Sequence, residues 1–160
     1  MELLQLVKGW KPGKFFLDFV IAESDKTSEP KMRSNLKNFS DNTFAVHRIP
    51  RAREVGQSWS STIFTTAQAL VTCLYTVFVL RPKLVLVNGP GTCVPVVAVA
   101  LLYECMFCRR FSLVFVESFC RTRTLSMTGK IVYPLADRVV VHHKKLVESY
   151  PKAEYLGCIY

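Results

Sequence analysis

The sequence has few acidic residues, and it lacks any recognisable nucleic-acid-binding motif. Among its 160 residues, 12 Asp and Glu stand against 21 Lys and Arg, which gives a formal net charge of +9. A balance this basic favours an anionic partner, namely a membrane surface, a phosphorylated ligand or a nucleic acid. The basic residues are scattered, and no helix-turn-helix, RNA-binding or zinc-finger signature accompanies them. We therefore expect no nucleic-acid partner.

The sequence also lacks a second cysteine pair to accompany its single C-x-x-C, which Cys105 and Cys108 form. One such pair without further ligands is weak support for a zinc site, so we expect no metal and no cofactor. Most cysteines lie in apolar segments rather than at the loop positions of a disulfide framework. We expect reduced thiols, mainly in the core, and hence a cytosol-facing protein. The six cysteines are Cys73, Cys93, Cys105, Cys108, Cys120 and Cys158.

No signal peptide is visible, because residues 1–10 have the apolar spacing of an amphipathic helix. The segment 61–80 carries no charge and has about the length of a membrane-spanning helix. It contains Gln68 and five threonines, and the next expected strand begins only four residues later. That spacing is typical of a helix folding back onto a sheet. We favour a buried or membrane-apposed helix of the domain over a membrane span.

Strand and helix patterns alternate along the chain, and we find no internal repeat or low-complexity segment. This alternation predicts one α/β domain over residues 1–160, with a parallel sheet covered by helices on both faces. Strands are expected at 14–22, 43–49, 84–88, 111–117, 138–142 and 154–157. Helices are expected at 1–9, 61–80, 93–108, 124–136 and 143–150. Polar residues 23–41 and 51–60 are expected to be loops, the first with at most a helical turn.

The stretch Leu84–Thr92, LVLVNGPGT, is the most informative part of the chain. Its apolar start predicts a strand buried on both faces, and an apolar run long enough for a helix follows the loop. Gly89 and Gly91 permit unusual backbone angles, Thr92 is expected to cap the helix, and Pro95 fits its first turn. A helix N-terminus after such a loop can bind a phosphate. The alternative is that the glycines only form a tight turn.

Ligands of open α/β sheets bind beyond the carboxyl ends of the strands, so the loops at those ends are candidate site segments. Three of the four loops carry cationic or phosphate-compatible groups, and we expect all of them at one edge of the sheet. These segments are Arg48–Arg53, Asn88–Gly91, Glu117–Arg123 and His142–His143.

Four motifs in order carry a resemblance to one family. They are H-R-I-P-R-A-R-E-V at 47–55, N-G-P-G-T-C-V-P at 88–95, V-E-S-x-C-R at 116–121 and T-L-S-M-T-G-K at 124–130. Together they resemble the family of membrane-anchoring subunits of the two-subunit UDP-N-acetylglucosamine transferase of asparagine-linked glycosylation. The resemblance extends from about Met1 to Tyr160.

The resemblance implies a split GT-B enzyme, akin to the bacterial transferase that makes lipid II. A catalytic partner subunit would supply the nucleotide-sugar-binding domain. A subunit of the present kind would supply the Rossmann-like acceptor side and hold the complex at the cytosolic face of the endoplasmic reticulum membrane. The complex would add the second N-acetylglucosamine to dolichyl-diphosphate N-acetylglucosamine.

The resemblance also implies roles for the loop residues. The diphosphate of the acceptor would lie at Asn88, Gly89, Gly91 and Thr92, with charge-assisted contacts from Arg121 and Arg123. Phosphates or anionic head groups would meet Arg48, Arg51 and Arg53.

An acidic residue follows the equivalent strand in the bacterial relative, and Glu117 stands at that place. Glu117 would orient the acceptor sugar through its hydroxyls or act as a base. The alternative is a buried carboxylate paired with an arginine. We expect structural roles for His47, His142 and His143.

The family normally begins with a transmembrane helix, a first strand and a Gly-Gly-His loop, and the present sequence shows none of these. We therefore expect a sheet that lacks the usual first strand, a marginal fold for the chain alone, and the loss of the histidine that would be the leading general-base candidate. A truncated product, a splice form or an incomplete gene model would explain the difference.

Three functional hypotheses remain open. The first is a non-catalytic, acceptor-binding subunit of a transferase complex. The second is a self-sufficient transferase, which the length disfavours because a GT-B enzyme needs two such domains. The third is a binding-only interaction protein.

The C-terminal residues 155–160 are apolar and are a candidate docking edge for the partner.

Overall fold

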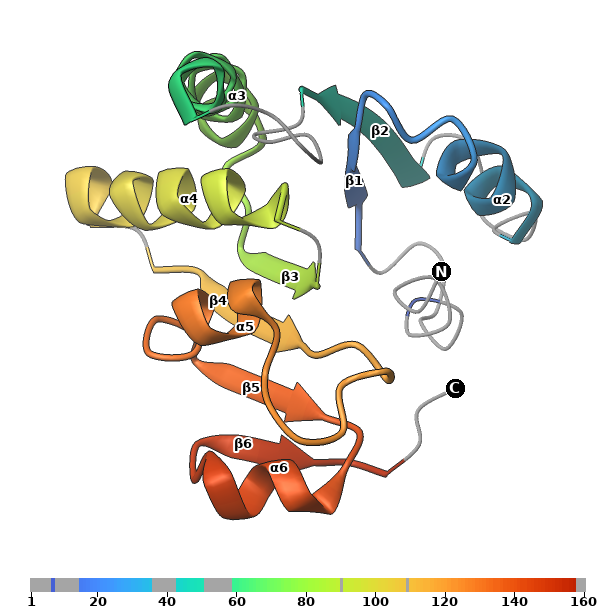
Figure 1. Cartoon of the computed structure of the whole chain (residues 1–160). Coiled ribbons are helices and arrows are strands. Elements are labelled where there is room, and N and C mark those ends of the chain that lie inside the picture. The colour runs from blue at the N-terminus through green and yellow to red at the C-terminus, as the bar shows by residue number, and fades with distance from the viewer. Residues whose placement is uncertain are drawn as a thin grey trace. The chain divides into compact units, whose positions relative to one another are not determined.

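The computed structural model describes most of the chain, and at 59–64 it describes the backbone alone. The described residues are 7, 15–35, 43–50, 59–89, 91–108 and 110–157. The chain divides into two compact units, residues 1–76 and residues 77–159. The described strands form two parallel sheets accompanied by helices, which confirms the predicted α/β, Rossmann-like fold (Figure 1). The expectation of a single domain over 1–160 stays a prediction.

The sheet of the first unit consists of β1 (Leu17–Ala22) and β2 (Phe44–Ile49), which pair in parallel along their whole length. Alternate positions face the core, where Phe19 meets Phe44 edge to face at a centroid distance of 6.2 Å. Met32 of the intervening helix is buried in the same apolar cluster. The backbone N–H of Glu23 donates to the carbonyl of Ile49 at 2.8 Å and continues the pairing past the strand end.

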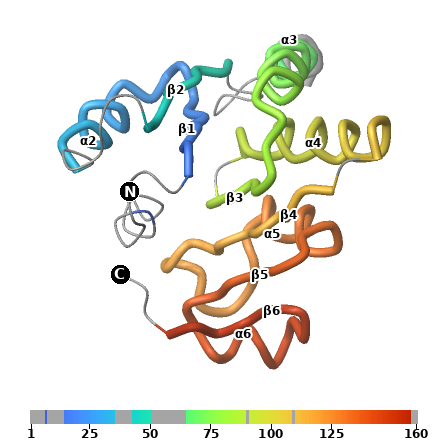
Figure 2. The backbone as a smooth tube through the Cα atoms, turned by 180° about the vertical axis from the view of Figure 1, so that it is seen from behind, coloured from blue at the N-terminus to red at the C-terminus, as the bar shows by residue number. Residues whose placement is uncertain are grey.

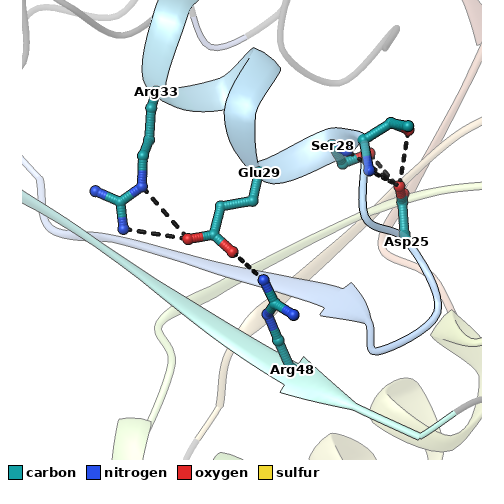
Figure 3. A network of polar contacts seen from close by, with 6 residues as sticks. Asp25, Ser28, Glu29, Arg33 and Arg48 are labelled. Carbon is teal, nitrogen blue, oxygen red and sulfur yellow. Dashed lines mark hydrogen bonds and ion pairs between the residues drawn. The ribbon is translucent and has the colours of Figure 1, made fainter.

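Helix α2 (Ser28–Asn35) is longer than the single turn that the sequence suggested for this region. Met32 is the buried residue of this helix, and one buried apolar residue does not form the repeating apolar pattern that predicts a helix. The helix begins where Asp25 accepts hydrogen bonds from the backbone N–H groups of Thr27 at 3.1 Å and Ser28 at 3.0 Å (Figure 3). A carboxylate at this place satisfies N–H groups that have no partner within the helix and complements its dipole.

Helix α3 (Trp59–Leu80) matches the predicted helix 61–80 and crosses the boundary between the two units. Ala69, Cys73 and Val77 recur every four residues and are buried. Exposed Val71, Tyr75 and Val79 follow the same spacing on another face. Within the described part of the chain, none of the helices combines the length and apolar character that crossing a membrane requires.

The second unit alternates strands and helices in the predicted order. Its elements are β3 (Leu84–Asn88), α4 (Cys93–Phe107), β4 (Ser112–Val116), α5 (Met127–Val132), β5 (Arg138–Val141), α6 (Lys144–Ser149) and β6 (Ala153–Tyr155). The strands lie side by side in the order β3-β4-β5-β6, all parallel (Figure 2). Helix α4 contacts β3 and α5, and α6 contacts β5 and β6.

The core of the second unit is centred on β4 and β5. Leu113, Phe115, Val139 and Val141 are at most 1% exposed. Central parallel strands are covered on both faces, which explains their continuous apolar runs. Strand β3 differs from the prediction, because Leu84 is exposed and Val87 is the buried residue of the strand. Among the described strands β3 pairs with β4 alone, so it is the outermost strand of this four-stranded sheet.

Helix α5 is shorter than the predicted 124–136. Ser126 is its N-cap, with an extended backbone and a side chain that accepts the N–H of Gly129 at 2.9 Å. Residues 124–125 therefore lie outside the helix. At the other end, Pro134 follows the C-cap Tyr133 and has no N–H to continue the helical pattern.

The cysteines correct the expectation of mainly buried thiols. Of those that the structure describes, Cys73 is buried and Cys93 is half-buried, whereas Cys105, Cys108 and Cys120 are exposed. The difference arises at the end of α4, where Cys108 forms the C-cap in a left-handed conformation, and in the loop after β4, which holds Cys120. Cys158 lies outside the described residues.

Candidate functional site

In the loop between β3 and α4, Gly89 has a φ of +63°, a backbone angle that the sequence predicted glycine would permit here. A side chain would strain this backbone, which accounts for glycine at this position. Gly91 does not share the positive φ, so of these two glycines it is Gly89 that uses the backbone freedom that both permit. Apart from its chain neighbours, no heavy atom of the described residues lies within 4 Å of a Cβ added at either glycine. The backbone at Gly89 and at Gly91 is thus open to a close approach.

Thr92 does occupy the N-cap position of α4, but it does not cap as predicted. Its backbone is already helical (φ −63°, ψ −19°), and its side chain makes no capping hydrogen bond. A capping side chain requires an extended N-cap backbone, which Thr92 lacks. Pro95 is in the first turn, as predicted, and is buried.

Asn88 joins the loop after β3 to the neighbouring strand. It pairs with Val116 across the sheet, and its side-chain Nδ2 donates to the carbonyl oxygen of Val116 at 3.4 Å. Glu117 follows directly, and its own N–H donates to the carbonyl of Val140 on β5 at 2.9 Å. The structure therefore brings Asn88 and Glu117 to one edge, where the arrowheads of β3, β4 and β5 point the same way (Figure 1).

Glu117 is a fully buried acidic residue, with 0% of its surface exposed. Its Oε1 accepts the backbone N–H of Ser118 at 2.9 Å, and its Oε2 accepts that of Ser126 at 2.7 Å. The alternative considered from the sequence is therefore right about the burial of Glu117 but wrong about its partner, because the described partners are backbone N–H groups and not an arginine. Such bonds offset the cost of removing a carboxylate from water.

The loop between Glu117 and Ser126 is further held by His143. The ring Nε2 of His143 lies 2.8 Å from the carbonyl oxygen of Phe119, which only accepts, so Nε2 is the donor. The Phe119 ring also lies 5.3 Å from the His143 ring and 6.0 Å from the His142 ring. His143 was expected to be structural, and the sequence contains no signal for its contact with this loop.

Arg121 and Arg123 lie in this loop and are exposed. The N–H of Arg121 donates to the carbonyl of Ser118 at 3.0 Å, which closes a turn at the start of the loop. Two guanidinium groups therefore stand on a loop that leaves the carboxyl edge of β4. The predicted roles of these arginines toward a diphosphate stay predictions.

Arg48 belongs to the other unit, where it pairs with Glu29. Its Nη2 lies 2.5 Å from Glu29 Oε2, and Arg33 binds the other oxygen of the same carboxylate (Figure 3). The hydrogen bond from Arg48 has the largest effect in lowering the pKa of Glu29, and the hydrogen bond from Arg33 has the next largest. In turn, the hydrogen bond to Glu29 raises the pKa of Arg48. The charge of Arg48 thus has a partner within its own unit. Arg51 and Arg53 lie outside the described residues.

The remaining histidine has a structural contact, as expected. His47 Nε2 lies 2.9 Å from Asp18 Oδ1, across the pairing of β1 with β2. Among the residues that the structure describes, no three His, Cys, Asp or Glu side chains gather in a way that could hold a metal ion.

The motifs at the sheet edge also mark the family. The chain matches the family described as "Oligosaccharide biosynthesis protein Alg14 like" over residues 1–159. The chain belongs to the Alg14 family. The resemblance seen in the four sequence motifs is thereby confirmed.

Relatives of this Alg14-family chain carry the name "UDP-N-acetylglucosamine transferase subunit ALG14". The Homo sapiens protein is 43% identical over 165 residues, which cover 99% of this chain and 76% of the human protein. The Rattus norvegicus protein is 42% identical with the same coverage. The Schizosaccharomyces pombe protein is 33% identical over 162 residues, covering 99% of this chain and 77% of its own length. No solved structure matches the chain significantly.

Proposed function

We propose that this Alg14-family chain is a non-catalytic subunit of a UDP-N-acetylglucosamine transferase complex and binds the lipid-linked diphosphate acceptor. The acceptor would be dolichyl-diphosphate N-acetylglucosamine, at the cytosolic face of the endoplasmic reticulum membrane. The chain would recruit a catalytic subunit there and form the acceptor half of a split GT-B enzyme. The names of its relatives support the transferase assignment.

The observation that carries the acceptor assignment is the junction of two loops at one sheet edge. The open turn at Gly89 precedes helix α4, which is 15 residues long. The positive end of the helix dipole therefore lies at that turn. The Asn88–Val116 hydrogen bond places this loop beside the strand that leads to Arg121 and Arg123. Backbone N–H groups and guanidinium groups are the donors that a diphosphate requires.

The test is transfer of N-acetylglucosamine to dolichyl-diphosphate N-acetylglucosamine in membranes that contain this chain with or without the catalytic subunit. We expect transfer with both subunits and none with this chain alone. Co-purification without transfer would favour the alternative, a binding-only interaction protein. Transfer by this chain alone would contradict both readings.

A second arm locates the acceptor site. In the complex, R121A/R123A should raise the acceptor KM about tenfold or more, since a hydrogen bond to a charged group contributes roughly 1.5–3 kcal/mol. R110A is the matched control, because Arg110 is exposed and precedes β4 at the opposite, amino end of the strand. Equal acceptor KM values for both variants and the unaltered complex would contradict the site.

A further inference from the structure

The geometry points to Glu117 as a positioning residue that holds the loop 118–126 and thereby presents Arg121 and Arg123 to the acceptor. This inference rests on the proposed function, because it concerns the same loop. It differs from a role as base or sugar ligand, since in it Glu117 does not touch the acceptor.

The carboxylate joins the two ends of the loop. One oxygen accepts the N–H of Ser118, the first residue after Glu117, and the other accepts the N–H of Ser126, the last residue before α5. Between these anchors lie residues 119–125, of which 119–124 are exposed and Leu125, next to the second anchor, is 2% exposed. The buried carboxylate of Glu117 thus binds both ends of a segment whose middle, 119–124, has little burial of its own.

Ser126 couples the same anchor to helix α5. Its N–H binds Glu117, while its Oγ accepts the N–H of Gly129 and caps the helix. Moving the carboxylate would therefore disturb the loop end and the helix start together. The position of the loop and the start of the helix are thus coupled, because both depend on hydrogen bonds of the same serine.

The surroundings of the carboxylate leave little room for another role. A Cβ at Gly129 would lie 2.6 Å from Glu117 Oε2, so α5 passes close to that oxygen. The residue is 0% exposed, and each of its oxygens already accepts an N–H. A base or a sugar ligand must reach the substrate within hydrogen-bond distance. Glu117 instead acts on the acceptor through the arginines of the loop.

The decisive variant is E117Q, measured in the complex with the catalytic subunit. Glutamine keeps the shape of glutamate but replaces one oxygen with an NH₂ group, which cannot accept from Ser118 or Ser126. One end of the loop is then released. E148Q is the matched control, because Glu148 is an exposed glutamate of α6 in the same unit.

Two readouts are needed. Hydrogen exchange followed by mass spectrometry should show faster exchange of peptides covering 118–126 in E117Q and not in E148Q. The acceptor KM should rise about fivefold in E117Q, with kcat changed far less. The reason is that the released loop holds the arginines less firmly, and the loss in acceptor binding should be roughly that of one hydrogen bond.

The arginines supply the coupling test. In the R121A/R123A background, E117Q should change the acceptor KM by less than about twofold, because the groups that the loop presents are already absent. A loss of kcat at unchanged KM would overturn the inference in favour of a base. An unchanged exchange rate for 118–126, or a full additive effect of E117Q in that background, would overturn it too.

Failure of the proposed function has a different signature. If R121A/R123A leaves the acceptor KM unchanged, the arginines do not bind the acceptor, whatever E117Q does to the exchange rate, and the positioning inference falls with that function. If R121A/R123A raises KM while E117Q changes neither exchange nor KM, the proposed function stands and the inference is overturned.

Discussion

A β-carbon at Gly129 would lie 2.6 Å from the Oε2 atom of Glu117, closer than such carbons come to neighbouring atoms in proteins. The same carbon would lie 3.1 Å from Phe115 Cε1 and 3.1 Å from Ser126 Oγ. Each of these neighbours is buried, so none of them can swing away into solvent. The glycine is therefore required by the carboxylate and not by its own backbone angles.

Gly129→Ala should destabilise the protein by about 1–3 kcal/mol, the usual cost of overpacking a filled core. An alanine inside a helix would otherwise stabilise by about 0.5–1 kcal/mol, so the sign of the change reports the clash. Thermal unfolding of the complex with the catalytic subunit measures it. Gly91→Ala is the control, since its added carbon meets nothing within 4 Å. Equal melting temperatures for both variants would contradict the clash.

Gly89→Ala should also destabilise the protein, but through its backbone and not through a clash. The φ of Gly89 is +63°, which strains any residue that has a β-carbon. The expected cost is about 1–2 kcal/mol, and the turn should relax away from this geometry. The acceptor KM should rise in the complex, since the backbone N–H groups after β3 would change direction. R110A, at the opposite end of the neighbouring strand β4, again serves for comparison. A wild-type KM for Gly89→Ala would show that the turn at Gly89 is not needed for binding.

The cysteines should differ sharply in reactivity. Burial raises the pKa of the Cys73 thiol to about 11, from 9.0, and the thiolate is the reactive form. Its thiolate fraction should fall about a hundredfold below that of an ordinary thiol. At pH 8, iodoacetamide should label exposed Cys105, Cys108 and Cys120 first, as peptide mass spectrometry would show site by site. In urea, Cys73 should react as fast as the others; rapid labelling in the native protein would contradict its burial.

Asp25 should titrate at an unusually low pH. The hydrogen bond from the Ser28 side chain, with smaller contributions from Thr27, lowers the pKa of Asp25 from 3.8 to about 2. The folded pKa lies below the unfolded value, so the stabilisation is complete above about pH 4 and is lost as the pH falls toward 2. Carboxyl ¹³C shifts of Asp25 measure the midpoint directly. Ser28→Ala should raise the midpoint more than Thr27→Ala does, and a wild-type midpoint near 3.8 would contradict the capping geometry.

Most of the element order followed from local patterns. The strand at 84–88, the positive φ of Gly89 and Pro95 in the first turn of α4 were all predictable, because each depends on residues close in sequence. Helix α2 was underestimated because its buried residue is Met32 and its start depends on Asp25. The over-long prediction at 124–136 ignored Ser126 as a cap and Pro134 as a terminator.

The sequence predicted which sheet edge holds the candidate site, but not the contacts that its residues make there. The rule that ligands bind beyond the carboxyl ends of parallel strands selected Asn88 and Glu117, which the structure brings to one edge of the second unit. It also placed Arg48 at that edge, whereas Arg48 lies on β2 in the other sheet. No sequence pattern announced that Thr92 leaves its helix uncapped by its side chain, or that Arg48 pairs with Glu29. Those outcomes depend on backbone angles and on contacts between residues distant in sequence.

The sequence by itself determined the α/β class, most of the succession of strands and helices, the glycine of positive φ after β3 and the membership in the Alg14 family. These depend on periodicity, on glycine's freedom and on motifs read in order. The tertiary structure alone decided the environment of Glu117. Its carboxylate is buried and held by N–H groups because the chain returns nine residues later at Ser126, and Gly129 leaves the space for it. Burial and hydrogen-bond partners belong to the folded arrangement, and no single stretch of sequence contains them.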